Sequence, residues 1–164
     1  MRLDQIAGDA AGRTQESENS LHETAPFRIL LVEDNPGDVE LTREALRDTR
    51  VPLCLQVASD GVEALSVLHT ERDAASSRPD LIILDINLPK KSGLEVLEAL
   101  KSDPSLRQIP VLMLSCSAAD RDVFKSYDLH ANCYVRKPEN LDGFDKIFEA
   151  ISEFWMGVAK LPPR

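Results

Sequence analysis

A short apolar run that ends in an aspartate does most to constrain how this chain can fold. Residues 81–84 read Leu-Ile-Ile-Leu, Asp85 follows at once, and Pro89 and Gly93 then interrupt the chain. A continuous aliphatic run bounded by turn residues is typical of a strand buried on both faces, as in a parallel sheet. A carboxylate at the carboxyl end of such a strand lies where open α/β sheets bind ligands. On its own, however, Asp85 could equally well cap a helix that begins near Ser92.

The alternation of apolar strand and amphipathic helix repeats along the chain. Strands are predicted at residues 27–32, 52–58, 81–84, 109–114 and 132–136, and a segment with helical periodicity follows each of them. Such alternation indicates a parallel sheet covered by helices on both faces, with right-handed crossovers. The sequence therefore predicts a doubly wound five-stranded α/β domain over residues 27–157. Residues 52–58 are the most polar of the strands, which predicts an edge position.

Polar segments flank the predicted domain. Residues 1–26 show no sustained apolar period and are predicted to form a flexible N-terminal extension, and residues 158–164 a short C-terminal tail. No DNA-binding or catalytic output domain is expected after the last helix. That helix carries apolar and aromatic side chains at helical spacing, which are predicted to pack in the core. They are Phe144, Ile147, Phe148, Ile151, Phe154 and Trp155.

Composition argues against several functional classes. The net charge of −9 disfavours a surface for nucleic acid or for anionic membranes. No apolar run approaches the roughly 18 residues that a membrane span needs. The widely spaced Cys54, Cys116 and Cys133 form no CxxC pair, which predicts buried, reduced thiols in a cytoplasmic protein and no structural metal site.

The carboxyl ends of parallel strands meet at one edge of the sheet, and the residues there are unusual. Three carboxylates (Glu33, Asp34 and Asp85), one hydroxyl (Ser115) and one ammonium (Lys137) follow the predicted strands. Carboxylates a few ångströms apart repel one another, so the cluster calls for a divalent cation. A set of oxygen ligands without His or Cys favours Mg²⁺. The hydroxyl and the ammonium would then suit the remaining oxygens of a phosphoryl group.

These motifs are similar to those of a known family. They are Leu-Val-Glu-Asp-Asn at 31–35, Leu-Asp-Ile-Asn-Leu-Pro at 84–89, Ser115, and Tyr-Val-Arg-Lys-Pro at 134–138, with 30 positions from Asp85 to Ser115 and 22 more to Lys137. Over nearly all of residues 27–157 the chain resembles the receiver domain of two-component response regulators. The resemblance implies the flavodoxin-like receiver fold with strand order 2-1-3-4-5.

The resemblance also implies a chemistry for the acids. Asp85 would accept a phosphoryl group from the phosphohistidine of a sensor histidine kinase or a phosphotransfer protein. Mg²⁺ would be held by Asp34, Asp85, Glu33 through a water molecule, and the backbone carbonyl of Asn87. The protein would thus be a phosphoacceptor in signalling that catalyses only its own phosphorylation and slow dephosphorylation.

A switch would follow from the added charge. A phosphoryl group brings a charge of about −2 and gives Ser115 and Lys137 a partner that they lacked. Tyr134 would turn inward as Ser115 moves, and the face made by the fourth helix, fifth strand and fifth helix would change. The resemblance further implies a cis peptide bond before Pro138.

A narrower resemblance concerns small stand-alone regulators that partner phytochrome-type histidine kinases. It rests on Asn-Pro-Gly-Asp at 35–38, the long loop at 70–80, and Leu-His-Ala-Asn-Cys-Tyr at 129–134. It implies a homodimer through the fourth helix, fifth strand and fifth helix. The candidate contacts are Phe124, Tyr127 and the pair Phe154-Trp155.

Other interpretations of these residues stay open. A receiver-like binding module that is never phosphorylated is one, and a phosphatase of the haloacid-dehalogenase type is another, although it would need an acid where Asn87 stands. A third is a flavodoxin-like FMN carrier, but no Ser-, Thr- or Gly-rich phosphate loop follows Val32. Ser117 is predicted to cap the fourth helix, Tyr134 could be a static strand residue, and Lys90 is predicted to lie in a solvated loop.

Overall fold

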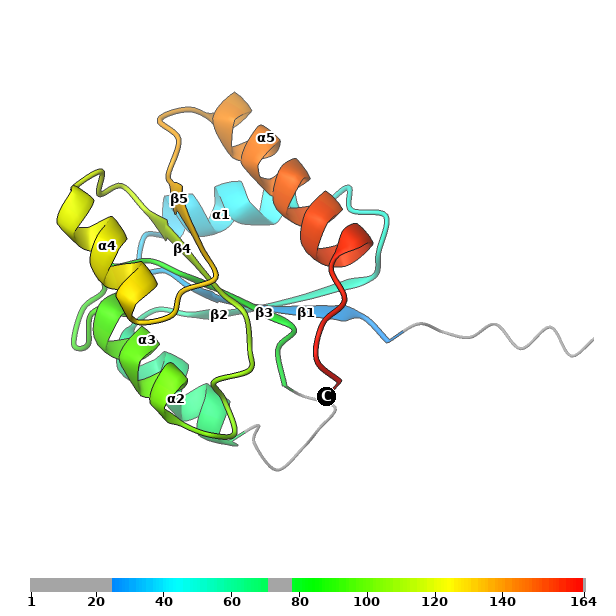
Figure 1. The fold of residues 1–164 in the computed structure, drawn as a ribbon. Helices are drawn as coiled ribbons and strands as arrows, with labels where there is room; N and C mark the ends of the chain where they lie inside the picture. The colour runs from blue at the N-terminus through cyan, green and yellow to red at the C-terminus, as the bar shows by residue number, and fades with distance from the viewer. Residues whose placement is uncertain (1–24, 71–77, 164) are drawn as a thin grey trace, which may run out of the picture.

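The computed structural model describes residues 25–70 and 78–163 and confirms the predicted fold. Its five parallel strands are β1 (Phe27–Val32), β2 (Leu53–Ala58), β3 (Leu81–Leu84), β4 (Val111–Ser115) and β5 (Cys133–Arg136), in the order β2-β1-β3-β4-β5. Helices α1 (Pro36–Ala45) and α5 (Leu141–Ser152) cover one face of the sheet (Figure 1). Helices α2 (Gly61–Thr70), α3 (Gly93–Ser102) and α4 (Asp120–Asp128) cover the other. Most of the predicted N-terminal extension and of the loop at 70–80 lies outside the described residues.

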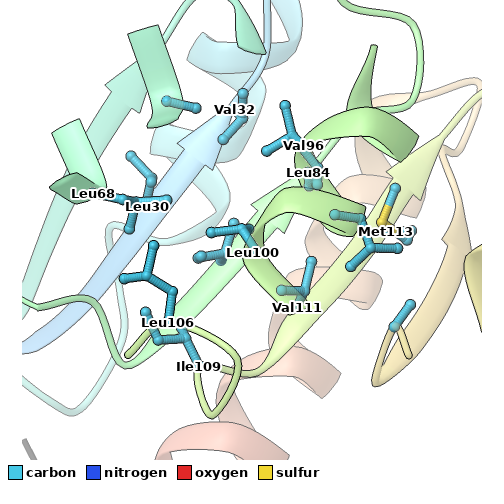
Figure 2. Packing of buried hydrophobic residues seen from close by; sticks show 14 of the residues in the cluster. Leu30, Val32, Leu68, Leu84, Val96, Leu100, Leu106, Ile109, Val111 and Met113 are labelled. Atoms are coloured by element: carbon cyan, nitrogen blue, oxygen red, sulfur yellow. The ribbon is translucent and has the colours of Figure 1, made fainter. Parts of the chain in front are cut away.

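Each face of the sheet has its own hydrophobic core. Along β3, Ile82 and Leu84 pack under α2 and α3, whereas Leu81 and Ile83 pack under α1 and α5. Figure 2 shows part of the first cluster. All four side chains are fully buried, because alternate residues of a strand point to opposite faces and helices cover both of them. The strand before Asp85 is therefore held from both sides.

The starts of two helices explain why Asp85 is not needed as a cap. The Asn35 side chain accepts a hydrogen bond from the Gly37 N–H at 2.8 Å and caps α1, with Pro36 in the first turn. At the start of α3, Ser92 and Glu95 form a reciprocal capping box. Asp85 thus stands outside both caps, and the helix-cap interpretation of this residue is wrong.

The burial of the cysteines differs in part from the prediction. Cys116 is exposed rather than buried, since the chain leaves the sheet after Ser115. Cys54 and Cys133 are half-buried on the two edge strands.

The C-terminal helix is partly core and partly surface. Phe144, Phe148 and Ile151 are buried, which confirms the predicted core stripe for these positions. The helix continues into a π-helical segment, η2 (Glu153–Val158), where Phe154 is exposed and its ring meets Trp155 edge-on. Beyond it, Leu161 packs on the α1–α5 core. Among the helices that the structure describes, none is long and apolar enough to cross a membrane.

Candidate functional site

Three carboxylates converge at the carboxyl edge of the sheet. Glu33 and Asp34 follow β1, Asp85 follows β3, and the two strands are neighbours in the middle of the sheet. One oxygen of each carboxylate lies within 4.8 Å of the others. Glu33 and Asp85 are buried, whereas Asp34 is exposed. Convergent oxygen donors with one open side fit a hard divalent cation such as Mg²⁺, which keeps several of its water ligands.

Lys137 reaches this acidic cluster from the end of β5. Its Nζ donates to Glu33 Oε2 at 2.5 Å, to Asp85 Oδ2 at 2.6 Å and to Asp38 Oδ2 at 2.9 Å. The lysine side chain is only 3% exposed. The structure therefore brings together Glu33, Asp85 and Lys137 as the topology predicts, and it adds a fourth acid.

That fourth acid, Asp38, was not predicted as a site residue. It lies in the first turn of α1, where acidic residues are common because the positive end of the helix dipole stabilises their charge. Its spacing from Asp34 offers a partial signal, because residues four apart share a helix face. Asp34, however, precedes the helix, so this signal alone does not direct Asp38 toward Lys137.

The charges of the site are strongly coupled. Burial by itself would lower the pKa of Lys137, but its hydrogen bonds to Asp38, Asp85 and Glu33 outweigh burial and raise the pKa above its ordinary value. Burial raises the pKa of Glu33, and the hydrogen bond from Lys137 offsets only part of that rise. Three carboxylates thus bind one ammonium, and the exposed Asp34 adds a fourth negative charge beside two of them. The excess negative charge favours a cation beside Asp34.

The turn after β3 is anchored around Asp85. The Asp85 N–H continues the sheet by donating to the Val32 carbonyl at 3.1 Å, and Asp85 Oδ1 accepts from the Asn87 N–H at 3.2 Å. The Gly93 N–H donates to the Ile86 carbonyl at 2.9 Å. These bonds set the direction of the Asp85 side chain. The role of the Asn87 carbonyl toward a metal stays a prediction.

The far side of this turn is tied to α2. Lys90 has a φ of 63°, and its ammonium forms an ion pair with Asp60. The buried Asp60 also accepts from the N–H groups of Val62 and Glu63, so the same carboxylate caps α2. Lys90 lies in an exposed loop, as predicted, and its ammonium is in addition paired with Asp60. The cause of this pairing is a left-handed turn that points the side chain back at the helix.

A second network surrounds the end of β4. Ser115 is buried, and its Oγ accepts from the Ser117 N–H at 3.4 Å. The Tyr134 hydroxyl donates to the Ser117 carbonyl at 2.8 Å. Ser117 Oγ donates to Asp122 Oδ2 at 2.5 Å. The structure therefore joins Ser115 and Tyr134 through Ser117, on the loop that leads into α4.

Two smaller expectations about this region are wrong. The residue at the N-cap of α4 is Ala119, which makes no side-chain cap, because Ser117 lies two positions too early and binds Asp122 instead. All peptide bonds of the described residues are trans, including the bond before Pro138. The trans form is intrinsically preferred even before proline, by about 0.5–1 kcal/mol.

The fold and this edge together define the class of the protein. The family model of the response regulator receiver domain matches residues 29–150. The chain therefore belongs to the response regulator receiver family, whose general function is phosphorylation by a histidine kinase.

Individual relatives narrow the comparison. Response regulator Rcp1 of Synechocystis sp. is 42% identical over 138 residues, which cover 84% of this chain and 94% of the relative. The crystal structure of the phosphorylated cyanobacterial phytochrome response regulator RcpA is 50% identical, with a TM-score of 0.79 over 84% of this chain and 99% of that one. The Mn²⁺-bound form of Rcp1 is also similar, with a TM-score of 0.77, 42% identity and coverage of 84% and 99%. The chain is thus similar to phytochrome response regulators.

Proposed function

We propose that Asp85 accepts a phosphoryl group from a phosphohistidine in an Mg²⁺-dependent reaction, and that the protein signals through this modification. The observation that carries the proposal is the setting of the Asp85 carboxylate. Lys137 binds one of its oxygens at 2.6 Å, the Asn87 N–H binds the other at 3.2 Å, and two further acids lie beside it. A buried carboxylate held at both oxygens is oriented for in-line attack.

The transfer step uses the residues as follows. An Asp85 carboxylate oxygen forms a bond to phosphorus, the bond from phosphorus to the histidine nitrogen breaks, and the imidazole leaves with the electron pair. Bound Mg²⁺, held by Glu33, Asp34 and Asp85, would neutralise charge on the phosphoryl oxygens. Lys137 supplies a second positive charge, and the Ser115 hydroxyl a donor for a third oxygen. Little other chemistry is required of the protein.

The reset step distinguishes a signal from an enzyme. Water attacks phosphorus, the bond to the Asp85 oxygen breaks, and the carboxylate and inorganic phosphate are restored. A phosphatase of the haloacid-dehalogenase type places an acid two positions after its nucleophile, but this chain has the amide Asn87 there, with its side chain exposed. Without a proton donor at that position turnover stays slow, which favours a signalling protein over a phosphatase.

Uptake of the phosphoryl group tests the proposal. The protein incubated with Mg²⁺ and acetyl phosphate is expected to gain one phosphoryl group, measured by intact mass, and to lose it in alkali as an acyl phosphate does. The variant Asp85→Asn keeps the size of the side chain and should gain none. An unmodified wild type would instead support a receiver-like binding module that is never phosphorylated.

The similarity to RcpA and Rcp1 supports a sensor histidine kinase of the phytochrome type as the donor. A phosphotransfer protein would present the same phosphohistidine chemistry. The proposal includes a cytoplasmic location, where ATP-dependent kinases work, and no role for nucleic acid or a membrane. The acidic net charge of −9 supports that last part.

The proposal also includes a homodimer through α4, β5 and α5. Phe124 and Tyr127 on α4 are 71% and 50% exposed, and Phe154 after α5 is 51% exposed. Large exposed apolar side chains are typical of protein contacts. Light scattering is expected to show a dimer that Phe124→Ala weakens by about tenfold or more in dissociation constant.

The matched control for the dimer is Val62→Ala, since Val62 is 50% exposed on α2 and outside the proposed contact. It should leave the dimer unchanged. A wild type that is monomeric at every concentration would contradict this part of the proposal and leave the phosphoryl chemistry intact.

A further inference from the structure

The partners of Lys137 include one acid that a cation-binding role does not explain. Glu33 and Asp85 belong to the cluster with Asp34 whose oxygens converge, but Asp38 does not. Asp38 nonetheless accepts from Lys137 Nζ at 2.9 Å, from the first turn of α1. Its contact is therefore with the lysine itself.

A count of protons shows why this contact matters. A lysine ammonium has three N–H donors and no acceptor. Lys137 gives them to three carboxylates, those of Glu33, Asp38 and Asp85. No proton of Nζ is left over, so a phosphoryl oxygen can be bound by Lys137 only if one carboxylate gives up its share.

The geometry indicates which carboxylate gives way. The contact to Asp38 is the longest of the three, at 2.9 Å against 2.5 and 2.6 Å. The Asp38 side chain is 22% exposed, whereas those of Glu33 and Asp85 are 3% and 8% exposed. A carboxylate that water can reach loses least when it gives up an ammonium, because water replaces the lost hydrogen bond.

We propose that Asp38 is a positioning residue that holds Lys137 at rest and is exchanged for a phosphoryl oxygen when Asp85 becomes phosphorylated. This inference rests on the proposed phosphorylation of Asp85. It makes Asp38 a competitor of the phosphoryl group, both for the third proton of Lys137 and through its negative charge. Asp38 therefore sets how firmly the phosphorylated state is held.

Binding of beryllium fluoride with saturating Mg²⁺ tests the inference, with BeF₃⁻ standing in for the phosphoryl group. Asp38→Asn should bind BeF₃⁻ more tightly than the wild type, by roughly three- to tenfold. The substitution removes a nearby negative charge and leaves a weaker acceptor to compete for the Lys137 ammonium. Titration calorimetry measures the affinity. A merely structural role for Asp38 would produce weaker binding when the residue is changed, so a gain in affinity separates the two.

Three controls complete the experiment. Asp38→Glu keeps the charge and an acceptor for Lys137, so it should keep wild-type affinity. Glu40→Gln removes the same charge from the same helix, but Glu40 is exposed and pairs with Arg43, so it should change the affinity by less than about twofold. Asp85→Asn should bind no BeF₃⁻.

Equal or weaker binding by Asp38→Asn, or the same gain in Glu40→Gln, would overturn the inference. A wild type that binds no BeF₃⁻ would instead overturn the proposed function.

Discussion

Replacing Lys137 with methionine is expected to lower the free energy of unfolding by about 3–5 kcal/mol in metal-free buffer near pH 7. Methionine keeps an unbranched side chain of similar shape but carries no charge. Glu33 and Asp85 would then remain buried, beside each other, without the ammonium that binds both. Removing one partner of a buried ion pair is costly because the remaining charge is left uncompensated in a poorly solvated place.

The dependence on pH and on metal identifies the cause of this loss. Burial raises the pKa of the Glu33 carboxyl, and without the opposing ammonium of Lys137 this carboxyl holds its proton to a still higher pH than in the unfolded chain. The folded state then binds more protons than the unfolded state, so the stability of the variant falls as pH rises and recovers as pH is lowered toward 5. Millimolar Mg²⁺ should also restore part of the loss, because it binds the folded state.

Urea unfolding with EDTA or Mg²⁺, at pH 5 and at pH 7, measures these effects. Lys146→Met is the matched control, because Lys146 is exposed on α5 and its loss should change stability by less than about 0.5 kcal/mol. If Lys137→Met and Lys146→Met unfold at the same urea concentration, the ammonium of Lys137 does not stabilise the acidic edge.

Gly93→Ala is expected to destabilise the fold by about 3 kcal/mol, the upper part of the usual range for added atoms in a packed place. A Cβ at this position would lie 1.9 Å from the carbonyl oxygen of Asp85 and 2.8 Å from the Cα of Ile86. Both are backbone atoms, so the end of β3 or the start of α3 has to move. Because that backbone orients the Asp85 side chain, uptake from acetyl phosphate should slow as well.

Gly157→Ala provides the comparison, since a Cβ there meets no atom within 4 Å. Alanine also reduces the conformational freedom of the unfolded chain, so this variant should be as stable as the wild type or slightly more stable. Urea unfolding of the two variants measures the difference. A Gly93→Ala protein with wild-type stability would show that α3 can shift freely away from the loop after Asp85.

The sheet and its acidic edge could be predicted because they depend on local patterns. The runs that form β1 and β3 are apolar on both faces, and parallel topology then places Glu33 next to Asp85. Lys137 follows from the same rule, applied to β5. Their roles toward metal and phosphate remain predictions, and the experiments above test them.

Asp38 and Lys90 show what could not be predicted. The contact between Asp38 and Lys137 spans 99 positions and depends on where the first turn of α1 lies relative to the carboxyl edge of the sheet. The pairing of Lys90 depends on a positive φ, which a lysine adopts rarely and which its residue type does not indicate. Cys116 illustrates the same limit, because an apolar residue next to a strand is exposed when the chain turns away just before it.

The bond between Lys137 and Glu33 joins residues 104 positions apart, from an edge strand to the centre of the sheet. Contacts over such a separation carry a large loop-closure entropy and are slow to form. During synthesis, a chain that has completed only β1 to β4 would hold the acids but not their lysine. On the proposed function, the phosphoryl-accepting edge is therefore complete only once the last strand has formed.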